Sequence, residues 1–186
     1  MNRTLQLDVI ASDATFDISK KNRFFLSRSW NLSKPLVGFC MCNPSTATED
    51  QDDPSVYKCQ MLARNWEYGG VNIVNAFSWR STDPAGLYHR LETAEIIEEN
   101  VRYIQHVASV CVIFVCAWGM NAHLNDRHIM LVNRLKPYRN KLRHLRLCKD
   151  GTPMHPLYLP YGTEPSFWDP WEKEDAVAEK VQRLRV

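Results

Sequence analysis

The sequence lacks several features that would assign it to a specialised class of protein. It has no apolar run long enough to cross a membrane, and no signal peptide is apparent. Its six cysteines form no C-x-x-C pair, so neither a zinc site nor a redox motif is indicated. Several cysteines fall inside apolar runs, as buried free thiols do. We therefore expect a reduced, cytoplasmic protein without a metal or other cofactor.

An excess of charge of one sign is also missing. The formal net charge is +2, which is too small to demand a polyanionic partner, so the placement of the charges matters more than their sum. Apolar residues make up 45% of the chain and charged residues 24%, as in ordinary globular proteins. There is no internal repeat and no low-complexity linker. The 186 residues are therefore expected to form one domain, residues 1–186.

The most informative stretch is a continuous apolar run at 36–42 that stops at Asn43-Pro44. Such a run is typical of a strand buried on both faces, as in a parallel sheet. Proline cannot continue a central strand, and small polar residues and an acidic cluster at 49–53 follow. In open α/β folds ligands bind at this carboxyl end of the strands. An ordinary strand followed by a solvated acidic loop is the alternative interpretation.

The rest of the chain alternates between strand and helix patterns. Period-two alternation predicts an N-terminal β-hairpin at about 14–30, before a core at about 35–186. Three further strands are expected, at 71–77, 109–119 and 143–148. Four helices are expected, at 55–67, 91–107, 121–135 and 171–185. This order predicts an α/β fold, a three-layer α/β/α domain with a central, mostly parallel four-stranded sheet.

The predicted strand ends carry, in chain order, Asn43-Pro44-Ser45, then Asn75 with Arg80 and Asp83-Pro84, then residues 115–119, then His155-Pro156. This order resembles the uracil-DNA glycosylase superfamily. The resemblance covers most of residues 36 to 160, and the chain looks like a small branch without an assigned function. Its two motifs are Asn-Pro-Ser-Thr-Ala at 43–47 and Gly-x-Pro-x-His-Pro-Leu-Tyr at 151–158. The resemblance implies a uracil-DNA glycosylase-like fold and a DNA glycosylase that flips a base out of DNA and hydrolyses its N-glycosidic bond, leaving an abasic site. The iron–sulfur cysteines of some relatives are absent.

The resemblance also implies roles for individual residues. Asn43 stands where relatives hold a residue that assists the attacking water, Asn75 where an asparagine reads the base, and His155 where a histidine supports the leaving base. Because an amide cannot act as a base, a neighbouring carboxylate is needed, with Asp53 preferred and Asp52 next. Donors near the base and a carboxylate near the sugar match the charges that develop as the bond breaks. Alternatively, Asn75 caps a turn, His155 supports its own loop, and Asp53 caps the following helix.

Basic residues gather late in the chain, just before His155. A cluster of this kind could neutralise phosphates and give a salt-dependent affinity for DNA. Arg139, Lys141 and Arg143 are its candidate DNA-binding members, and Arg80 is a further candidate; a solvated basic surface is the alternative. The cluster consists of Arg134, Lys136, Arg139, Lys141, Arg143, Arg146 and Lys149.

Three apolar or aromatic side chains are candidates for contacts with DNA or the base. Tyr158 and Leu159 are placed to fill the gap left by a flipped base, as apolar wedges do. Trp79 could stack on the base, although a tryptophan beside a proline-containing loop often only packs.

The residues after Asn43-Pro44 bear on the substrate. In the uracil-specific relatives a bulky aromatic follows the corresponding pair and blocks substituents at the pyrimidine 5-position. Here Ser45, Thr46 and Ala47 follow, and all are small. The resemblance therefore implies room for a large 5-substituent, with Ser45 as a base-binding residue. Glycosylated hydroxymethylcytosines of viral DNA carry such substituents, and an enzyme that removes them would act in antiviral defence.

Two other functions fit the same residues. An N-glycosidase of the same fold, acting on free nucleosides or nucleotides, would need neither the basic cluster nor the wedge. A non-catalytic nucleic-acid-binding module would bind DNA and leave no abasic site. Neither a membrane nor an obligatory protein partner is indicated.

Overall fold

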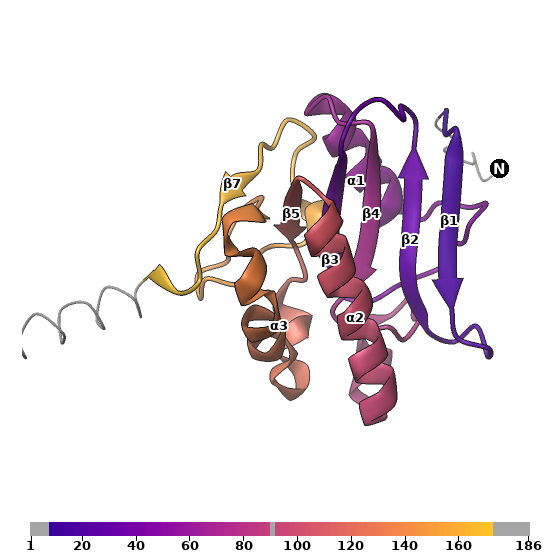
Figure 1. The fold of residues 1–186 in the computed structure, drawn as a ribbon. Coiled ribbons are helices and arrows are strands. Elements are labelled where there is room, and N and C mark those ends of the chain that lie inside the picture. The colour runs from indigo at the N-terminus through magenta and orange to yellow at the C-terminus, as the bar shows by residue number, and fades with distance from the viewer. Residues whose placement is uncertain (1–7, 90–91, 173–186) are drawn as a thin grey trace, which may run out of the picture.

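A computed structural model describes residues 8–89 and 92–172, which form a single mixed sheet flanked by helices (Figure 1). The strands lie in the order β1-β2-β4-β3-β5-β6-β7. The central four run parallel to one another. They are β4 (Gly70–Asn75), β3 (Leu36–Met41), β5 (Ile113–Cys116) and β6 (Leu142–His144). The predicted parallel core is confirmed.

Antiparallel strands extend this core at both edges, so the sheet has seven strands rather than the four expected. The predicted hairpin is present as β1 (Ala11–Phe16) and β2 (Arg23–Ser29). It joins the main sheet, because β2 pairs with β4 through Leu26 and Ile73. At the other edge β7 (Ser166–Phe167) pairs with β6. Two residues are too short to show a strand periodicity, which is why the sequence did not reveal β7.

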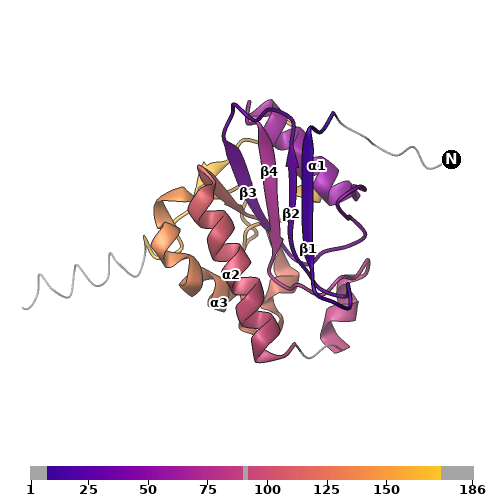
Figure 2. The same cartoon turned by 45° about the vertical axis from the view of Figure 1, so that its right-hand side comes forward.

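Helices cover both faces of the sheet, which confirms the predicted three layers (Figures 1 and 2). Helix α1 (Pro54–Asn65) packs on one face, where Phe39 and its neighbours on alternate positions of β3 are buried. Helices α2 (Ala94–Val110) and α3 (Arg127–Leu135) pack on the other face, where Cys40 is buried. Strand β3 is apolar throughout because both of its faces are covered.

Two elements differ from expectation for local reasons. The strand expected at 109–119 is only β5, because α2 runs on to Val110 and a continuous apolar run shows no periodicity that separates the two. The helix expected at 121–135 begins as a 3-10 helix, η2 (Met120–Asp126), and breaks where Asn125 and Asp126 have φ of 54° and 53°. Asparagine and aspartate tolerate this left-handed conformation.

Two further expectations concern the end of the chain. The strand expected at 143–148 ends at His144, before a turn at Gly151 whose φ is +88°. The helix expected at 171–185 lies almost entirely outside the described residues. Within the described ranges, no helix has the length and apolar character needed to span a bilayer.

Each of the four parallel strands delivers a loop to the carboxyl edge of the sheet, where the carboxyl ends of these strands lie. Residues 42–53 follow β3, residues 76–83 follow β4, and Gly119 makes the turn from β5 into η2 with φ of +69°. The loop after β6 contains the short 3-10 helix η4 (Pro156–Tyr158). The N–H of Gly119 donates to Pro153 O at 2.9 Å, which joins the loop after β5 to the loop after β6.

Candidate active site

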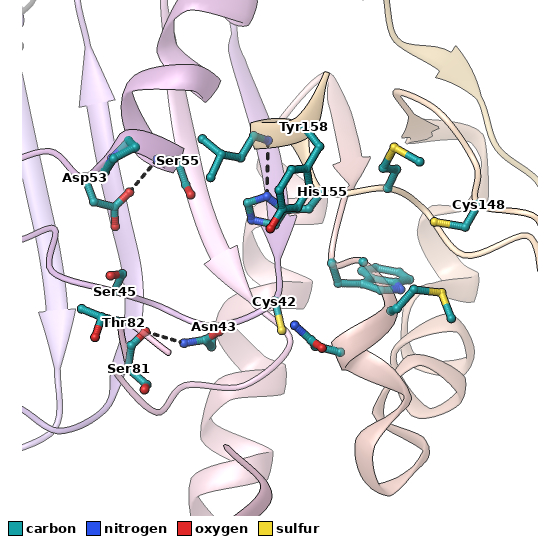
Figure 3. Close-up of a pocket in the computed structure, with 17 residues that line it drawn as sticks. Cys42, Asn43, Ser45, Asp53, Ser55, Ser81, Thr82, Cys148, His155 and Tyr158 are labelled. Atoms are coloured by element: carbon teal, nitrogen blue, oxygen red, sulfur yellow. Dashed lines mark hydrogen bonds between the residues drawn. The ribbon is translucent and has the colours of Figure 1, made fainter. Parts of the chain in front are cut away.

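A cavity of about 570 Å³ opens among these four loops, at the carboxyl ends of the parallel strands (Figure 3). This is the edge at which open α/β sheets bind ligands. The cavity brings together all three candidate catalytic residues. Its lining includes Asn43, Ser45, Asp53, Ser81, Thr82, Trp118, His155, Leu157 and Tyr158.

Asn43 lies at the end of β3 with its side chain held in one orientation. Its Nδ2 donates to Ser81 O at 2.9 Å and to Pro44 O at 3.1 Å. Both partners are carbonyl oxygens, so the amide nitrogen must face them and the Oδ1 atom must face away. Among the described residues Oδ1 has no hydrogen-bond partner. A fixed carbonyl oxygen of this kind is suited to accept a hydrogen bond from a water molecule.

Asp53 is both a helix cap and a cavity residue. Its Oδ1 accepts hydrogen bonds from the backbone N–H groups of Ser55 and Val56, each at 2.9 Å, which caps α1. Both helix contacts use the same oxygen, so Oδ2 is not committed to the cap. Asp52, the second choice, does not line the cavity; it pairs with Arg28 at 2.9 Å. The geometry therefore favours Asp53 over Asp52 as the carboxylate of the cavity that Asn43 also lines.

His155 is a neutral hydrogen-bond donor at pH 7. The backbone N–H of Leu157 donates to its Nδ1 at 3.3 Å, so the proton of the neutral ring is on Nε2. Burial lowers the pKa of His155 to about 4, and the carboxylate of Asp53 acts in the opposite direction. The hydrogen bond from Leu157 to His155 also caps η4, so His155 supports its own loop, as the alternative interpretation of the sequence expected. With Nδ1 so occupied, Nε2–H is the ring donor left for a ligand in the cavity, which His155 lines.

Apolar residues that the sequence did not single out form the opposite wall. Trp118 is fully buried and packs edge-on against Trp168, with ring centroids 5.6 Å apart, which makes this wall rigid. Met120, Cys148 and Met154 continue it. The turn at Gly119 was visible in the sequence, but nothing in the apolar run before it distinguished a cavity wall from the core.

Burial keeps the cysteine at the start of the first loop in its thiol form. Cys42 lines the cavity, but burial raises the pKa of its thiol to about 12. The thiol is therefore protonated at neutral pH and much less reactive than a thiolate.

Two of the expected base-binding residues lie outside the cavity lining. Asn75, at the end of β4, is 1% exposed, and its Oδ1 accepts a hydrogen bond from Arg23 Nη2 at 3.4 Å. Trp79 packs against the core on the α2 side of the sheet. Of the base-binding residues expected from the sequence, Ser45 alone lines the cavity.

The apolar residues at the cavity mouth are shifted by one position from those expected. Leu159 is 5% exposed and packs in the core beneath α1, so it could not enter DNA without leaving the core. Tyr158 is 78% exposed and Leu157 is 44% exposed, and both line the cavity. The exposed pair is therefore Leu157 and Tyr158. The sequence placed Leu157 inside the motif, but its exposure depends on the turn of η4.

The candidate DNA-binding arginine near the first loop serves an internal contact. Arg80 Nε donates to Ser45 O at 3.3 Å and its Nη2 donates to Thr46 O at 3.4 Å. It therefore supports the cavity wall from behind.

The basic cluster is divided between the carboxyl edge of the sheet and the opposite, amino edge, where the parallel strands begin. Lys141 donates to the carbonyls that end α2, immediately before β5, so it lies at the amino ends of the strands. Arg139 pairs there with Asp169, and Arg143 lies over the ring of Phe167. The cavity is at the opposite edge.

Two members of the cluster lie on the cavity side. Arg146 and Lys149 are exposed and follow β6. The carbonyl of Arg146 accepts a hydrogen bond from Met154 N at 2.8 Å, and Lys149 follows Cys148; Met154 and Cys148 both line the cavity.

Comparison with known proteins defines the family. The chain belongs to the family described as "Protein of unknown function (DUF1643)", whose model matches residues 23–157. No curated protein and no solved structure matches the chain significantly. The matched segment begins at β2 and ends at the cavity mouth, so it includes Asn43, Asp53 and His155.

Proposed function

We propose that the protein is a DNA glycosylase of the uracil-DNA glycosylase superfamily, which hydrolyses the N-glycosidic bond of a modified or damaged base and leaves an abasic site. The observation that carries the proposal is the meeting of Asn43, Asp53 and His155 in one cavity. Asn43 and Asp53 come from the loop after β3, whereas His155 is about a hundred positions further along the chain. Together they supply an acceptor, a carboxylate and a neutral donor.

These three groups match the charges of the reaction. As the bond between C1′ and the base breaks, its electron pair moves to the base and the sugar becomes positive. Nε2–H of His155 donates to the developing anion on the base, and the carboxylate of Asp53 stabilises the cation. The water oxygen bonds to C1′ while Asn43 Oδ1 accepts one of its hydrogen bonds. The water molecule loses a proton as it bonds to C1′; this proton passes to the carboxylate of Asp53 and then to the departing base.

The dimensions of the cavity favour a base larger than uracil. The volume of about 570 Å³ falls within the range of pockets that hold drug-sized ligands. Ser45 lines it with a small side chain, as the open 5-position requires, whereas Thr46 is exposed and Ala47 is buried in the core. We take a bulky 5-modified pyrimidine of viral DNA, such as a glycosylated hydroxymethylcytosine, as the candidate substrate. The biological role would then be antiviral defence.

A second function is favoured by one observation. Arg139, Lys141 and Arg143 make contacts within the protein at the edge of the sheet away from the cavity. An N-glycosidase for free nucleosides or nucleotides needs no DNA path. On the DNA glycosylase proposal, Arg146 and Lys149 approach the phosphates, while Leu157 and Tyr158 replace the flipped base.

The test is incubation with a panel of DNAs, each containing one modified base, and with the matching mononucleotides. Released bases are identified by mass spectrometry, with Asn43→Ala as the control for contaminating activity. Release from DNA by the unaltered protein alone supports the proposal. Release from mononucleotides alone favours the nucleotide N-glycosidase. DNA binding without release of any base would assign the protein as a non-catalytic binding module.

A further inference from the structure

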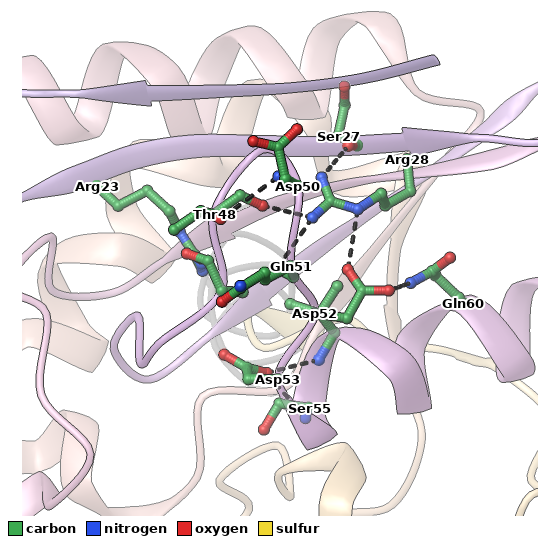
Figure 4. A network of polar contacts seen from close by, with 12 residues as sticks. Arg23, Ser27, Arg28, Thr48, Asp50, Gln51, Asp52, Asp53, Ser55 and Gln60 are labelled. Atoms are coloured by element: carbon green, nitrogen blue, oxygen red, sulfur yellow. Dashed lines mark hydrogen bonds and ion pairs between the residues drawn. The ribbon is translucent and has the colours of Figure 1, made fainter. Parts of the chain in front are cut away.

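The loop at residues 42–53 forms part of the cavity wall, yet it contains no helix or strand. It carries Asn43, Ser45 and Asp53, all of which line the cavity. One backbone hydrogen bond, from Thr48 N to Gln51 O at 2.9 Å, closes a turn within it. Much of the remaining support comes from arginine side chains of other segments (Figure 4).

Arg28, on β2, makes the most contacts with this loop. Its Nη2 donates to Thr48 O at 2.5 Å and to Gln51 O at 3.2 Å, and its Nε donates to Asp52 Oδ1 at 2.9 Å. The side chain is 3% exposed, so water does not replace these contacts. The rigid fork of a guanidinium satisfies several acceptors at once, which a lysine ammonium on a flexible stem does less well. Arg28 thereby holds the residue immediately before Asp53.

Arg23, also on β2, holds the middle of the loop. Its Nη1 donates to Ala47 O at 3.0 Å, and the side chain is 1% exposed. Burial lowers the pKa of Arg23 to about 10, and the carboxylate of Asp53 opposes this shift. The guanidinium is therefore charged at neutral pH and lies within electrostatic reach of Asp53. Arg80 binds the carbonyls of Ser45 and Thr46. Together the three arginines therefore bind five carbonyls of the loop, those of residues 45, 46, 47, 48 and 51.

We infer that Arg23 and Arg28 of the N-terminal hairpin are positioning residues, which fix the loop so that Asn43 and Asp53 keep their places in the cavity lining, while Arg80 sets the position of the wall at Ser45. The inference rests on the proposed function for its kinetic consequence. None of the three arginines lines the cavity. The hairpin is thus a functional part of the site as well as an edge of the sheet. Misplacement of a reacting group by about 1 Å costs on the order of 10²-fold in rate.

The test compares Arg28→Lys with Arg127→Lys. Arg127 is a matched control because it is also buried and also pairs with a carboxylate, Glu92, at 2.5 Å, but does not contact the loop. Arg28→Lys is expected to lower kcat for base release by about 10- to 100-fold with little change in KM. Arg127→Lys is expected to lower thermal stability about as much as Arg28→Lys does, but to leave kcat within about twofold of the unaltered protein. Equal kcat values for the two variants would overturn the inference.

A second readout does not depend on any activity. Amide hydrogen exchange is measured at Thr48, Ser55 and Val56, whose N–H groups are bonded to Gln51 O or Asp53 Oδ1. In Arg28→Lys these amides are expected to exchange at least about tenfold faster, with the amides of β4 unchanged. If the protein releases no base but this difference appears, the proposed function fails and the positioning role stands. Unchanged exchange at all three amides would remove the positioning role, whatever the activity.

Discussion

The two edges of the parallel sheet differ in how their polar groups are used. At the amino edge Arg139 pairs with Asp169, and Lys141 donates to the last carbonyls of α2. At the carboxyl edge Asn43 keeps Oδ1 without a partner among the described residues, and the proton of His155 stays on Nε2. Charged groups that have partners within the protein stabilise it, whereas oriented groups left open are suited to bind a substrate.

The comparison teaches that a run of basic residues does not by itself locate a binding surface. The basic cluster from 134 to 149 contributes to both edges, because β6 lies in the middle of this segment and runs from the amino edge to the carboxyl edge. Its first part meets helix ends and acidic partners, and its last part flanks the cavity. The position of each cation relative to a strand therefore decides its role.

The largest expected effect is at Asn43. Asn43→Ala removes the oriented acceptor and is expected to lower base release by about 10²-fold or more. The cost to stability is about 1 kcal/mol, because the hydrogen bond to Ser81 O is lost. Single-turnover kinetics and thermal unfolding measure the two effects separately. Near-normal turnover in a folded variant would remove Asn43 from the mechanism.

The next effect separates the two roles of Asp53. Asparagine is as good a helix cap as aspartate, so Asp53→Asn keeps α1 intact while removing the charge. We expect a loss in kcat of about 10- to 100-fold with less than about 0.5 kcal/mol of destabilisation. Asp53→Ala is the matched variant that loses both roles. A rate equal to that of the unaltered protein in Asp53→Asn would leave Asp53 as a cap only.

A smaller effect is expected from charge reversal, and it distinguishes the two edges. Arg146→Glu with Lys149→Glu, on the cavity side, should lower the slope of log affinity against log salt for DNA by about 2. Arg139→Glu with Arg143→Glu, at the amino edge, should lower stability through loss of the Asp169 pair and change the slope little. Fluorescence anisotropy at several salt concentrations measures both. A larger change from the second pair would place the DNA path at the amino edge, with Arg139 and Arg143 as the DNA-binding residues expected from the sequence.

A further effect concerns the pH dependence of stability. The pKa of His155 is lowered to about 4 from an unfolded value near 6.5, so the unfolded chain takes up this proton first as the pH falls. The folded state should therefore lose stability between about pH 6.5 and 4 and show no further loss from this group below pH 4. Urea unfolding of the unaltered protein and His155→Gln at pH 7 and 4.5 isolates the contribution. An identical pH dependence in both would contradict the burial of a neutral His155.

The sequence predicted the parts of the fold that depend on local pattern. The apolar runs at β3, β4 and β5 gave the parallel core, and the stop at Asn43-Pro44 located the cavity edge. The sequence could not show that β2 pairs with β4, since strand partners depend on contacts distant in the sequence. It also missed the break at Asn125 and Asp126, where the helical pattern of apolar residues continues across a turn.

The sequence correctly predicted cavity residues where a candidate residue lies at the end of a strand or in a loop. Asn43, Asp53 and His155 do so, and all three line the cavity. Asn75 and Leu159 were expected to contact the base or DNA but are buried in other environments. The support that Arg23 gives to the first loop was not foreseen, because Arg23 lies in a hairpin remote from every motif. Buried arginines resemble surface arginines in sequence.

The central claim is that this cavity releases a base carrying a bulky 5-substituent, and Ser45→Tyr tests it most directly. Tyrosine at this wall would occupy the path of the substituent, and steric exclusion can exceed the ~1–3 kcal/mol available from one methylene of fit. Release from DNA with a bulky 5-modified pyrimidine and from DNA with the unsubstituted base is measured for the unaltered protein, Ser45→Ala and Ser45→Tyr, with folding checked by circular dichroism. We expect Ser45→Ala to retain both activities and Ser45→Tyr to lose the bulky substrate preferentially. Equal loss on both DNAs in folded Ser45→Tyr would contradict the claim.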